Sequence, residues 1–188
     1  MAEESSSTIT SIHVNRFNEE STKDFWEKFK EAESKSQQII PITIDSFGGE
    51  VYAALAMNDI IRSTNKVVIT TSVGKAMSCG LFLLAAGTPG YRFCSSNCSL
   101  MLHSVSSWAE GKVGDMQSDM KENIKLQKRF LFTMAHNCGK KNSYFLDIIN
   151  SNMDRDIFMT PKEALKHNII DKIGIPILKE KKEMIIEV

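Results

Sequence analysis

The spacing of apolar residues predicts that strands and helices alternate over the first half of the chain. Apolar and polar residues alternate in TITSIHV, residues 8–14, as they do in a half-buried strand. Phe25, Phe29 and Ala32 then recur at the spacing of an amphipathic helix. The β-branched segment QIIPITIDS, residues 38–46, predicts a second strand that ends before a Gly-Gly turn. This order of elements is typical of an α/β fold.

Two residues refine the expected bounds of these elements. Ser21 followed by Asp24 resembles a capping pair, so we expect the first helix to begin near Ser21. Pro41 has no N–H group to donate to a neighbouring strand. It therefore favours an edge position, or a strand start, for residues 38–46.

The alternation continues through the middle of the chain. The pattern predicts a helix in EVYAALAMNDIIRS, a buried strand in KVVITTSVG, a short buried helix in SCGLFLLAAG, and strands in YRFCSS and SLMLHSVSSW. Gly87 and Pro89 are expected to end the buried helix.

Helices dominate the second half. A long amphipathic helix is expected over residues 115–138, ended by Gly139. Its apolar face comprises Met116, Met120, Ile124, Leu131 and Met134. A second helix is expected over residues 142–151, and a third after Thr160, where a capping box coincides with Pro161 at the first helical position. The tail, ILKEKKEMIIEV, is expected to add a last strand or a contact segment.

Composition indicates an ordinary globular domain. The 188 residues are 42% hydrophobic and 24% charged, with a formal net charge of zero. We expect a single α/β domain over residues 1–188 with helical additions, in which residues 1–7 form a disordered lead. A neutral chain offers no broad basic surface to nucleic acid or to an anionic membrane. No apolar stretch is long enough to cross a bilayer.

The N-terminal sequence and the spacing of the cysteines favour a cytoplasmic protein, and no cofactor is expected. The N-terminus lacks the basic lead and apolar run of a secretory signal, and the 4 cysteines lack the spacing of a disulfide scaffold. Cys94, Cys98 and His103 could be drawn as zinc ligands. Because they alternate with strand residues and lack a matching second pair, no metal site is expected.

A lone serine stands at the start of the most apolar segment, GKAMSCGLFLLAAG, residues 74–87. Ser78 could be a helix N-cap, a position that serine favours. It could also be a nucleophile at a helix N-terminus, where backbone N–H groups stabilise negative charge. Taken alone, the segment favours the cap.

A serine nucleophile needs a base, normally histidine, and a third group that orients the base. His103 ends the apolar strand SLML, where a side chain can reach into a cleft. His13 fits a strand position, and His136 and His167 fit helix C-termini, where imidazole is favourable.

Several carboxylates could orient the base. Asp154 and Asp156 flank Arg155, with which either could simply form a structural ion pair. Asp45 ends a strand just before Gly48-Gly49, a pair that permits either a tight turn or a close backbone approach to a ligand.

Read in order, these pieces closely resemble the ClpP family, the proteolytic subunits of Clp protease. The family's Ser-Pro-Gly-Gly loop appears as SFGG at 46–49, and its nucleophile motif, Gly-x-Ala-x-Ser-x-Gly, as GKAMSCG at 74–80. Its Met-Ile-His appears as MLH at 101–103, and its Arg-Asp-x-Phe-Met as RDIFM at 155–159. The resemblance covers about residues 38–174.

The resemblance implies a role for each matching residue. Ser78 attacks the scissile carbonyl, His103 acts as general base and then acid, and Asp156 holds the imidazole tautomer. The backbone N–H groups of Gly49 and Cys79 form the oxyanion hole, so that the Cys79 thiol need not react.

Fold and assembly follow from the same resemblance. It implies a crotonase-like fold of repeated β-β-α units and a serine endopeptidase that cleaves peptides or unfolded chains inside stacked seven-membered rings. The helix at 115–138 is the protruding handle in the ring-to-ring contact, and a Clp-type AAA+ ATPase is the implied partner.

The chain departs from the family pattern at several positions. Phe47 replaces the family's proline, Ser104-Val105 replaces Gln-Pro, and SSWAEGK replaces a glycine-rich strand that binds substrate and joins rings. The segment before the Gly-Gly loop is shorter than in the family, and its lead, AEESSS, is polar. We therefore expect weak gating, with cleavage of peptides and loosely folded chains without ATP.

Three other functions remain open at this stage. They are a catalytically silent ring subunit, a crotonase-type acyl-CoA enzyme, and a peptidase with a Ser–Lys dyad in which Lys75 would be the base. The complete set of Ser78, His103 and Asp156 favours the serine endopeptidase over each of them.

Overall fold

The protein is described by a computed structural model that covers residues 9–107 and 110–178. Its strands are β1 (Ile12–Val14), β2 (Ile39–Ser46), β3 (Val67–Met77), β4 (Arg92–Cys94), β5 (Ser99–Leu102), β6 (Ile157–Met159) and β7 (Lys172–Ile173). Its helices are α1 (Glu19–Ser34), α2 (Val51–Arg62), α3 (Cys79–Ala85), α4 (Val113–Asn137), α5 (Tyr144–Ser151) and α6 (Pro161–Lys166).

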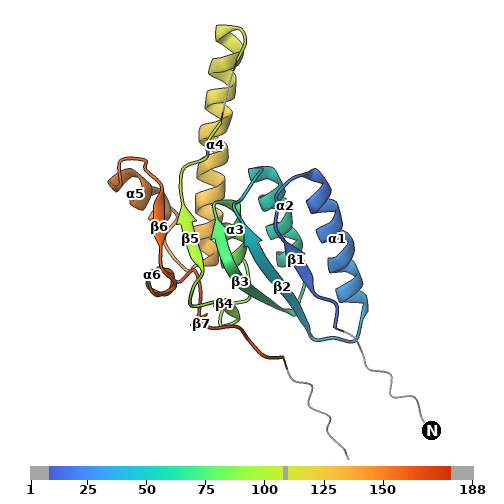
Figure 1. Ribbon diagram of the computed structural model, residues 1–188. Helices are drawn as coiled ribbons and strands as arrows, with labels where there is room; N and C mark the ends of the chain where they lie inside the picture. The colour runs from blue at the N-terminus through green and yellow to red at the C-terminus, as the bar shows by residue number, and fades with distance from the viewer. Residues whose placement is uncertain (1–8, 108–109, 179–188) are drawn as a thin grey trace, which may run out of the picture.

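All of these strands join one seven-stranded sheet. Its main path is β1-β2-β3-β4-β7, and β5 and β6 branch from the far end of β3 (Figure 1). The pairs are parallel except for β5 with β6, which run antiparallel. The expected α/β class is therefore confirmed, with a sheet that is mainly parallel.

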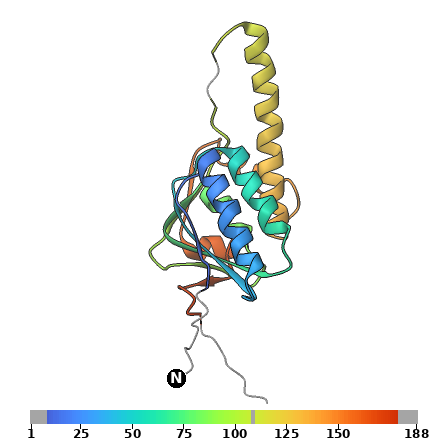
Figure 2. The same ribbon diagram turned by 90° about the vertical axis from the view of Figure 1, so that its right-hand side faces the viewer.

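Helices cover one face of this sheet and leave much of the other open. α1 and α2 lie side by side on the covered face, as the turned view shows (Figure 2). Alternate residues of β2 point to the two faces. Ile40, Ile42 and Ile44, on the covered face, are fully or almost fully buried, whereas Asp45, on the open face, is exposed. The short helix α3 is buried along its whole length, as its apolar sequence predicts.

The first helix begins earlier than Ser21. Asn18 is the N-cap: its side chain accepts a hydrogen bond from the Ser21 N–H, and the Ser21 hydroxyl in turn accepts from the Asn18 N–H. Ser21 thus completes the capping box from the third helical position. The predicted apolar face is correct, because Phe25, Phe29 and Ala32 are all buried.

The expectation for Pro41 was wrong for the strand as a whole but holds near the start of the strand, where Pro41 lies. β2 lies inside the sheet, between β1 and β3, and Pro41 lies within the strand opposite Ile69 of β3. The physical reason is the register of the other neighbour, since β1 begins to pair with β2 only at Ile42. Pro41 therefore has a strand on one side only, so its missing N–H disrupts no ladder with β1.

Helix α4 stands out from the body of the molecule (Figure 1). Near the body its apolar residues are buried, and Phe130 stacks on Phe82 of α3 with ring centroids 4.3 Å apart. Farther out, Met116, Met120 and Ile124 are 37%, 62% and 51% exposed. The apolar face predicted for this helix is thus half core and half uncovered surface.

Of the other predictions, one is confirmed and two fall largely on residues that the structure does not describe. The capping box at Thr160 and the placement of Pro161 are both present at the start of α6. Residues 1–7, expected to form a disordered lead, lie outside the described part of the chain, as does most of the C-terminal tail. Within the described ranges, no helix is both long and apolar enough to cross a membrane.

Candidate active site

Ser78 lies at a sharp turn between β3 and α3. Its backbone has φ 54° and ψ −119°, a conformation that non-glycine residues rarely adopt, and its side chain makes no capping bond to the helix. The Ser78 N–H donates to the Met101 carbonyl oxygen at 2.9 Å, which ties the turn to β5. Ser78 therefore occupies the N-cap position of α3, as one interpretation expected, but its side chain does not cap the helix. The geometry resembles the strained strand-to-helix elbow on which other hydrolases carry a nucleophile.

His103 follows β5 directly and faces Ser78. Its Nε2 lies 2.8 Å from the Ser78 Oγ, within hydrogen-bond distance. β5 pairs in parallel with β3, so the two chain segments that carry Ser78 and His103 leave the sheet at the same edge. The imidazole is about three-quarters buried, and an apolar sequence pattern alone could not have distinguished it from a core histidine.

Asp156 lies on the other side of His103. Its Oδ1 is 3.7 Å from the His103 Nδ1, which is longer than a hydrogen bond, and its side chain is 55% exposed. Asp156 comes immediately before β6, and β6 pairs with β5. The sheet thus brings Ser78, His103 and Asp156 together in the order expected for a serine peptidase triad, with a loose contact at its far end.

Asp154 makes a contact that the sequence did not reveal. Its carboxylate accepts a hydrogen bond from the Ser104 hydroxyl. Asp154 and the preceding Met153 both have positive φ, near 57° and 56°, so the turn before Asp156 is strained. This bond joins the segment after His103 to the segment before Asp156.

The Gly48-Gly49 loop approaches Ser78 very closely. A Cβ on Gly48 would lie 2.8 Å from the Ser78 Cβ, and a Cβ on Gly49 would lie 2.4 Å from the Phe17 carbonyl oxygen. Both glycines also have positive φ. Only glycine fits at these two positions without displacing the backbone.

Cys79 joins this loop to the start of α3. Its thiol, which is buried, donates to the Gly49 carbonyl oxygen at 3.3 Å. Burial raises the pKa of the Cys79 thiol to about 11, so the thiol stays protonated and is a poor nucleophile near neutral pH. The Cys79 N–H is the first of a helix and has no intrahelical acceptor, so it is free to bind an oxyanion.

Of the remaining candidate residues, Lys75 and His167 have structural partners. Lys75 pairs with Asp45 at 2.6 Å, a contact that occupies the ammonium a Ser–Lys dyad would need. His167 caps α6, and its Nδ1 lies 3.0 Å from the Tyr144 hydroxyl. His136 lies in the last turn of α4, as predicted, and His13 lies in β1.

Both cysteines considered as zinc ligands are buried, Cys94 at the end of β4 and Cys98 just before β5. Cys98 Sγ lies 2.9 Å from the Ser72 Oγ, whereas His103 faces Ser78. Among the described residues, no group of three His, Cys, Asp or Glu side chains is placed to hold a metal ion. All four cysteines are free thiols.

Comparison with known protein families identifies one family that matches most of the chain. The Clp protease family matches residues 6–176, which is most of the 188-residue chain and includes every residue of the site. The match also extends toward the N-terminus beyond the segment on which the sequence motifs lie. The chain belongs to the Clp protease family.

Proposed function

We propose that this protein is a serine endopeptidase in which Ser78, His103 and Asp156 form the catalytic triad. The observation that carries the proposal is the 2.8 Å separation between the His103 Nε2 and the Ser78 Oγ at a strained elbow. A nucleophile in hydrogen-bond contact with its base is the geometry that acyl transfer requires. Membership of the Clp protease family supports peptide bonds as the target.

The residues at the elbow support a two-step reaction. The Ser78 Oγ attacks the scissile carbonyl while the His103 Nε2 takes the hydroxyl proton, and the imidazolium then gives that proton to the leaving amine. The Gly49 and Cys79 N–H groups stabilise the oxyanion of the tetrahedral intermediate. Water then attacks the acyl-enzyme, with His103 again as the base.

Asp156 completes the triad when its contact with His103 shortens. A carboxylate that accepts the Nδ1–H keeps the Nε2 lone pair directed at Ser78 and stabilises the imidazolium. The 3.7 Å distance is one that a rotation of an exposed side chain can close. Catalytic hydrogen bonds are often long in ligand-free enzymes and tighten when substrate binds.

A serine-directed fluorophosphonate probe tests the proposal. We expect mass spectrometry to find the probe on Ser78 of the native protein, and we expect Ser78→Ala to abolish both labelling and peptidase activity. Ser106→Ala, which removes an exposed serine from the loop after His103, is the matched control and should label normally. Labelling of Cys79, or labelling that persists in Ser78→Ala, contradicts the assignment.

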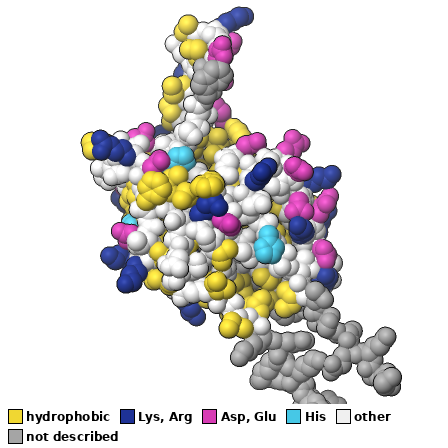
Figure 3. Space-filling model, viewed as in Figure 1, with side chains coloured by type: hydrophobic (Ala, Val, Ile, Leu, Met, Phe, Trp, Pro, Cys, Tyr) yellow, Lys and Arg dark blue, Asp and Glu magenta, His cyan; other side chains and the backbone are white. Residues whose placement is uncertain are grey.

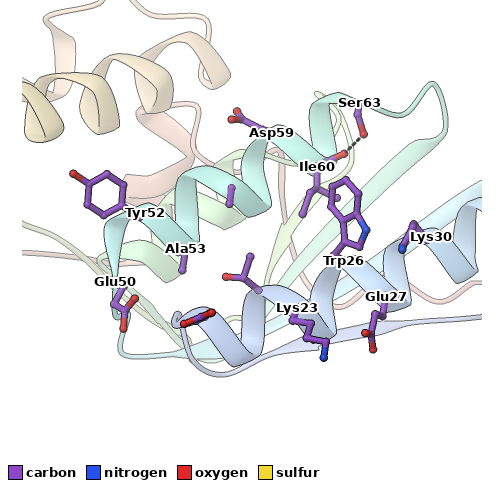
Figure 4. Close-up of a pocket in the computed structure, with 13 residues that line it drawn as sticks. Lys23, Trp26, Glu27, Lys30, Glu50, Tyr52, Ala53, Asp59, Ile60 and Ser63 are labelled. Carbon is purple, nitrogen blue, oxygen red and sulfur yellow. Dashed lines mark hydrogen bonds between the residues drawn. The ribbon is translucent and has the colours of Figure 1, made fainter.

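We also propose that the chain assembles into rings of about seven subunits that stack in pairs. The uncovered Met116, Met120 and Ile124 of α4 support a contact between rings. Within a ring, an apolar groove between α1 and α2 supports a contact with a second copy (Figure 4). This groove has a volume of about 900 Å³, and Trp26 and Ile60 line it from the two helices.

We propose that the complementary surface is the apolar segment after β7, where Ile175 and Ile177 are 63% and 81% exposed. Contact between two different surfaces of one molecule is heterologous, and it generates a ring when the rotation between subunits closes. We expect Trp26→Glu to yield monomers and Met120→Glu to yield single rings by analytical ultracentrifugation, whereas unaltered particle mass in both variants contradicts this arrangement.

We propose that the substrates are peptides and unfolded chains. We also propose that the protein acts in the cytoplasm. Four free thiols fit a reducing compartment. Cleavage of an unfolded casein without nucleotide, alongside resistance of a stable folded domain, is the expected result. Cleavage that appears only after addition of a Clp-type ATPase and ATP would show that access to the site is gated.

A further inference from the structure

We propose that Cys94 and Cys98 form a redox-sensitive dithiol, which a peroxide converts into a reversible disulfide that lowers peptidase activity. The effect on activity rests on the peptidase function proposed above, whereas formation of the disulfide does not. Both residues are free thiols outside the candidate active site, and no step of the proposed peptidase reaction uses them.

Both cysteines lie against the same serine of β3. Cys94, the last residue of β4, is the register partner of Ser72. Directly opposite residues of neighbouring strands point to the same face of a sheet, so the Cys94 and Ser72 side chains share a face. The Cys98 Sγ lies 2.9 Å from the Ser72 Oγ. The two thiols therefore meet beside Ser72.

The turn between β4 and β5 brings the two cysteines together. The Ser95 N–H donates to the Ser72 carbonyl oxygen at 2.9 Å, and the Cys98 N–H donates to the Ser95 carbonyl oxygen at 3.2 Å. A turn closed by such a backbone hydrogen bond keeps its two ends near one another. A disulfide between Cys94 and Cys98 therefore needs only a local adjustment of the chain.

The two thiols differ in how readily they ionise. Hydrogen bonds with the Cys94 thiol and the Ser72 hydroxyl lower the pKa of the Cys98 thiol, although burial opposes them. The contact with Cys98 and then burial raise the pKa of the Cys94 thiol. Because the thiolate is the reactive form of cysteine, Cys98 is the thiol that attacks an oxidant, and Cys94 is the resolving thiol.

Cys98 also has the better access to an oxidant. It is 4% exposed and lines a cavity of about 330 Å³, whereas Cys94 is 0% exposed. Ser96, Asn97 and Ser99 line the same cavity. The molecular surface between β5 and α6, over this cavity, is mostly uncharged (Figure 3). Such a cavity suits a small neutral oxidant such as hydrogen peroxide.

The proposed oxidation transfers two electrons to one molecule of hydrogen peroxide. The Cys98 thiolate attacks a peroxide oxygen, the O–O bond breaks, and the departing hydroxide takes up the thiol proton to become water. The Cys94 sulfur then attacks the Cys98 sulfenic acid. The S–S bond forms, the S–O bond breaks, and the Cys94 proton leaves with that oxygen as a second water. A thiol reductant reverses the reaction by exchange and returns both thiols.

The dithiol lies where β3 passes from one neighbouring strand to the next. β3 pairs with β4 up to Ser72 and with β5 from Lys75 onward. β3 then leads to Ser78, and β5 leads to His103. An S–S bond is about 2 Å long, so its formation draws Cys98 away from Ser72 and shifts the start of β5. We expect slower catalysis, because small displacements of reacting groups are costly.

Hydrogen peroxide treatment of the native protein tests the proposal. Cys94 and Cys98 share one tryptic peptide, residues 93–112, in which oxidation should remove both alkylation sites and two hydrogen masses. Over the same time, kcat/KM for a fluorogenic peptide should fall about tenfold. Dithiothreitol should restore both the alkylation and the activity.

Three variants assign the response to this pair. Cys98→Ser keeps a polar hydrogen on the side chain, so it should retain the basal activity and lose the response to peroxide. Cys94→Ala should leave a sulfenic acid on Cys98 that dimedone labels. Cys138→Ala is the matched control, because burial raises the pKa of that free thiol to about 12, and this variant should respond like the native protein.

Two alkylated cysteines in peptide 93–112 after peroxide treatment overturn the proposal, as does a disulfide that leaves kcat/KM unchanged. Equal inhibition of Cys98→Ser and the native protein also overturns it, because another residue would then be responsible. Normal fluorophosphonate labelling of Ser78 before treatment leaves the peptidase proposal in place in each case. Absence of labelling and of peptide cleavage in the untreated protein overturns the peptidase function and the effect on activity, while peptide 93–112 still reports whether the disulfide forms.

Discussion

Arg92 and His103 each lie opposite an aspartate, one pair in the core of the fold and the other at its open edge. The Arg92 side chain is 1% exposed. Its Nη2 lies 2.7 Å from the Asp171 Oδ1, and its Nε donates to the Asp171 Oδ2 at 2.9 Å. The His103 Nδ1 lies 3.7 Å from an Asp156 carboxylate that is 55% exposed. The Arg92–Asp171 pair thus has short contacts and little access to water, whereas the His103–Asp156 pair has a long contact and an exposed carboxylate.

The bonds around each pair explain the difference. Asp171 also accepts the backbone N–H groups of Gly90 and Arg92, and Arg92 donates to the Asn137 carbonyl oxygen at the end of α4. Such a network holds the pair in one geometry. Asp156 has no comparable set of bonds among the described residues, so its side chain is held less firmly. A network of short hydrogen bonds thus fixes the Arg92–Asp171 pair in the scaffold, whereas the pair that we propose to be catalytic is loosely held.

Replacing Asp156 tests the loose pair and should give the largest effect. Asp156→Asn keeps the size of the side chain but disfavours the required tautomer of His103, so we expect kcat to fall about 10³–10⁴-fold. The free energy of unfolding should change by less than about 0.5 kcal/mol, because the side chain is exposed.

Peptidase assays and urea unfolding measure these two quantities. Asp154→Asn is the matched control, since it changes the neighbouring carboxylate that contacts Ser104 and not the imidazole. If Asp154→Asn abolishes activity and Asp156→Asn does not, the orienting carboxylate has been misassigned.

Breaking the Arg92–Asp171 pair should show the opposite pattern, a large loss of stability. Arg92→Met leaves the Asp171 carboxylate, which is only 14% exposed, beside an apolar side chain, so we expect the free energy of unfolding to fall by about 3–5 kcal/mol. Arg92→Lys retains the charge but loses the two-point contact, and it should cost less. Denaturant unfolding at one fixed protein concentration measures both, and equal stability of Arg92→Met and the native protein would show that the pair contributes little to the fold.

Lowering the pH should give the smallest effects, on stability through the Arg92–Asp171 pair and on activity through His103. Burial alone raises the pKa of Asp171, but the hydrogen bonds from the Arg92 side chain and backbone outweigh it and the pKa is lowered. A depressed folded-state pKa contributes stability above the unfolded value, near 4, and that stability is lost as the pH falls through the folded-state value.

Activity should fall at a higher pH than stability does. His103 must be neutral to accept the Ser78 proton, and a protonated imidazole cannot serve as the base. Parallel pH profiles of peptidase rate and urea midpoint would show two separate transitions. Coincident transitions would mean that unfolding, and not protonation of the base, limits activity in acid.

The sequence predicts most elements of this fold because their apolar spacing is a local property. Phe25, Phe29 and Ala32 identify the buried face of α1, and the unbroken apolar residues of α3 identify a buried helix. The position of Pro41 within the sheet depends instead on where β1 begins to pair, which is a long-range register that no local pattern contains.

The candidate site divides in the same way. Ser78, His103 and Asp156 could be named from motifs, and the structure brings those side chains together. The contact between Ser104 and Asp154 joins two loops far apart in the sequence, and no signal in either loop predicted it. The role of Arg92 was equally hidden, because burial of an arginine becomes interpretable only when its carboxylate partner is known.

The separation of the site residues along the chain also bears on biosynthesis. A polypeptide emerging from the ribosome exposes Ser78 well before Asp156 has been translated, and the elbow at Ser78 depends on the Met101 carbonyl oxygen of a later strand. The nascent chain therefore cannot bring Ser78, His103 and Asp156 together until almost the whole domain has been made. Under the proposed function, the protein has no peptidase activity while it is being translated.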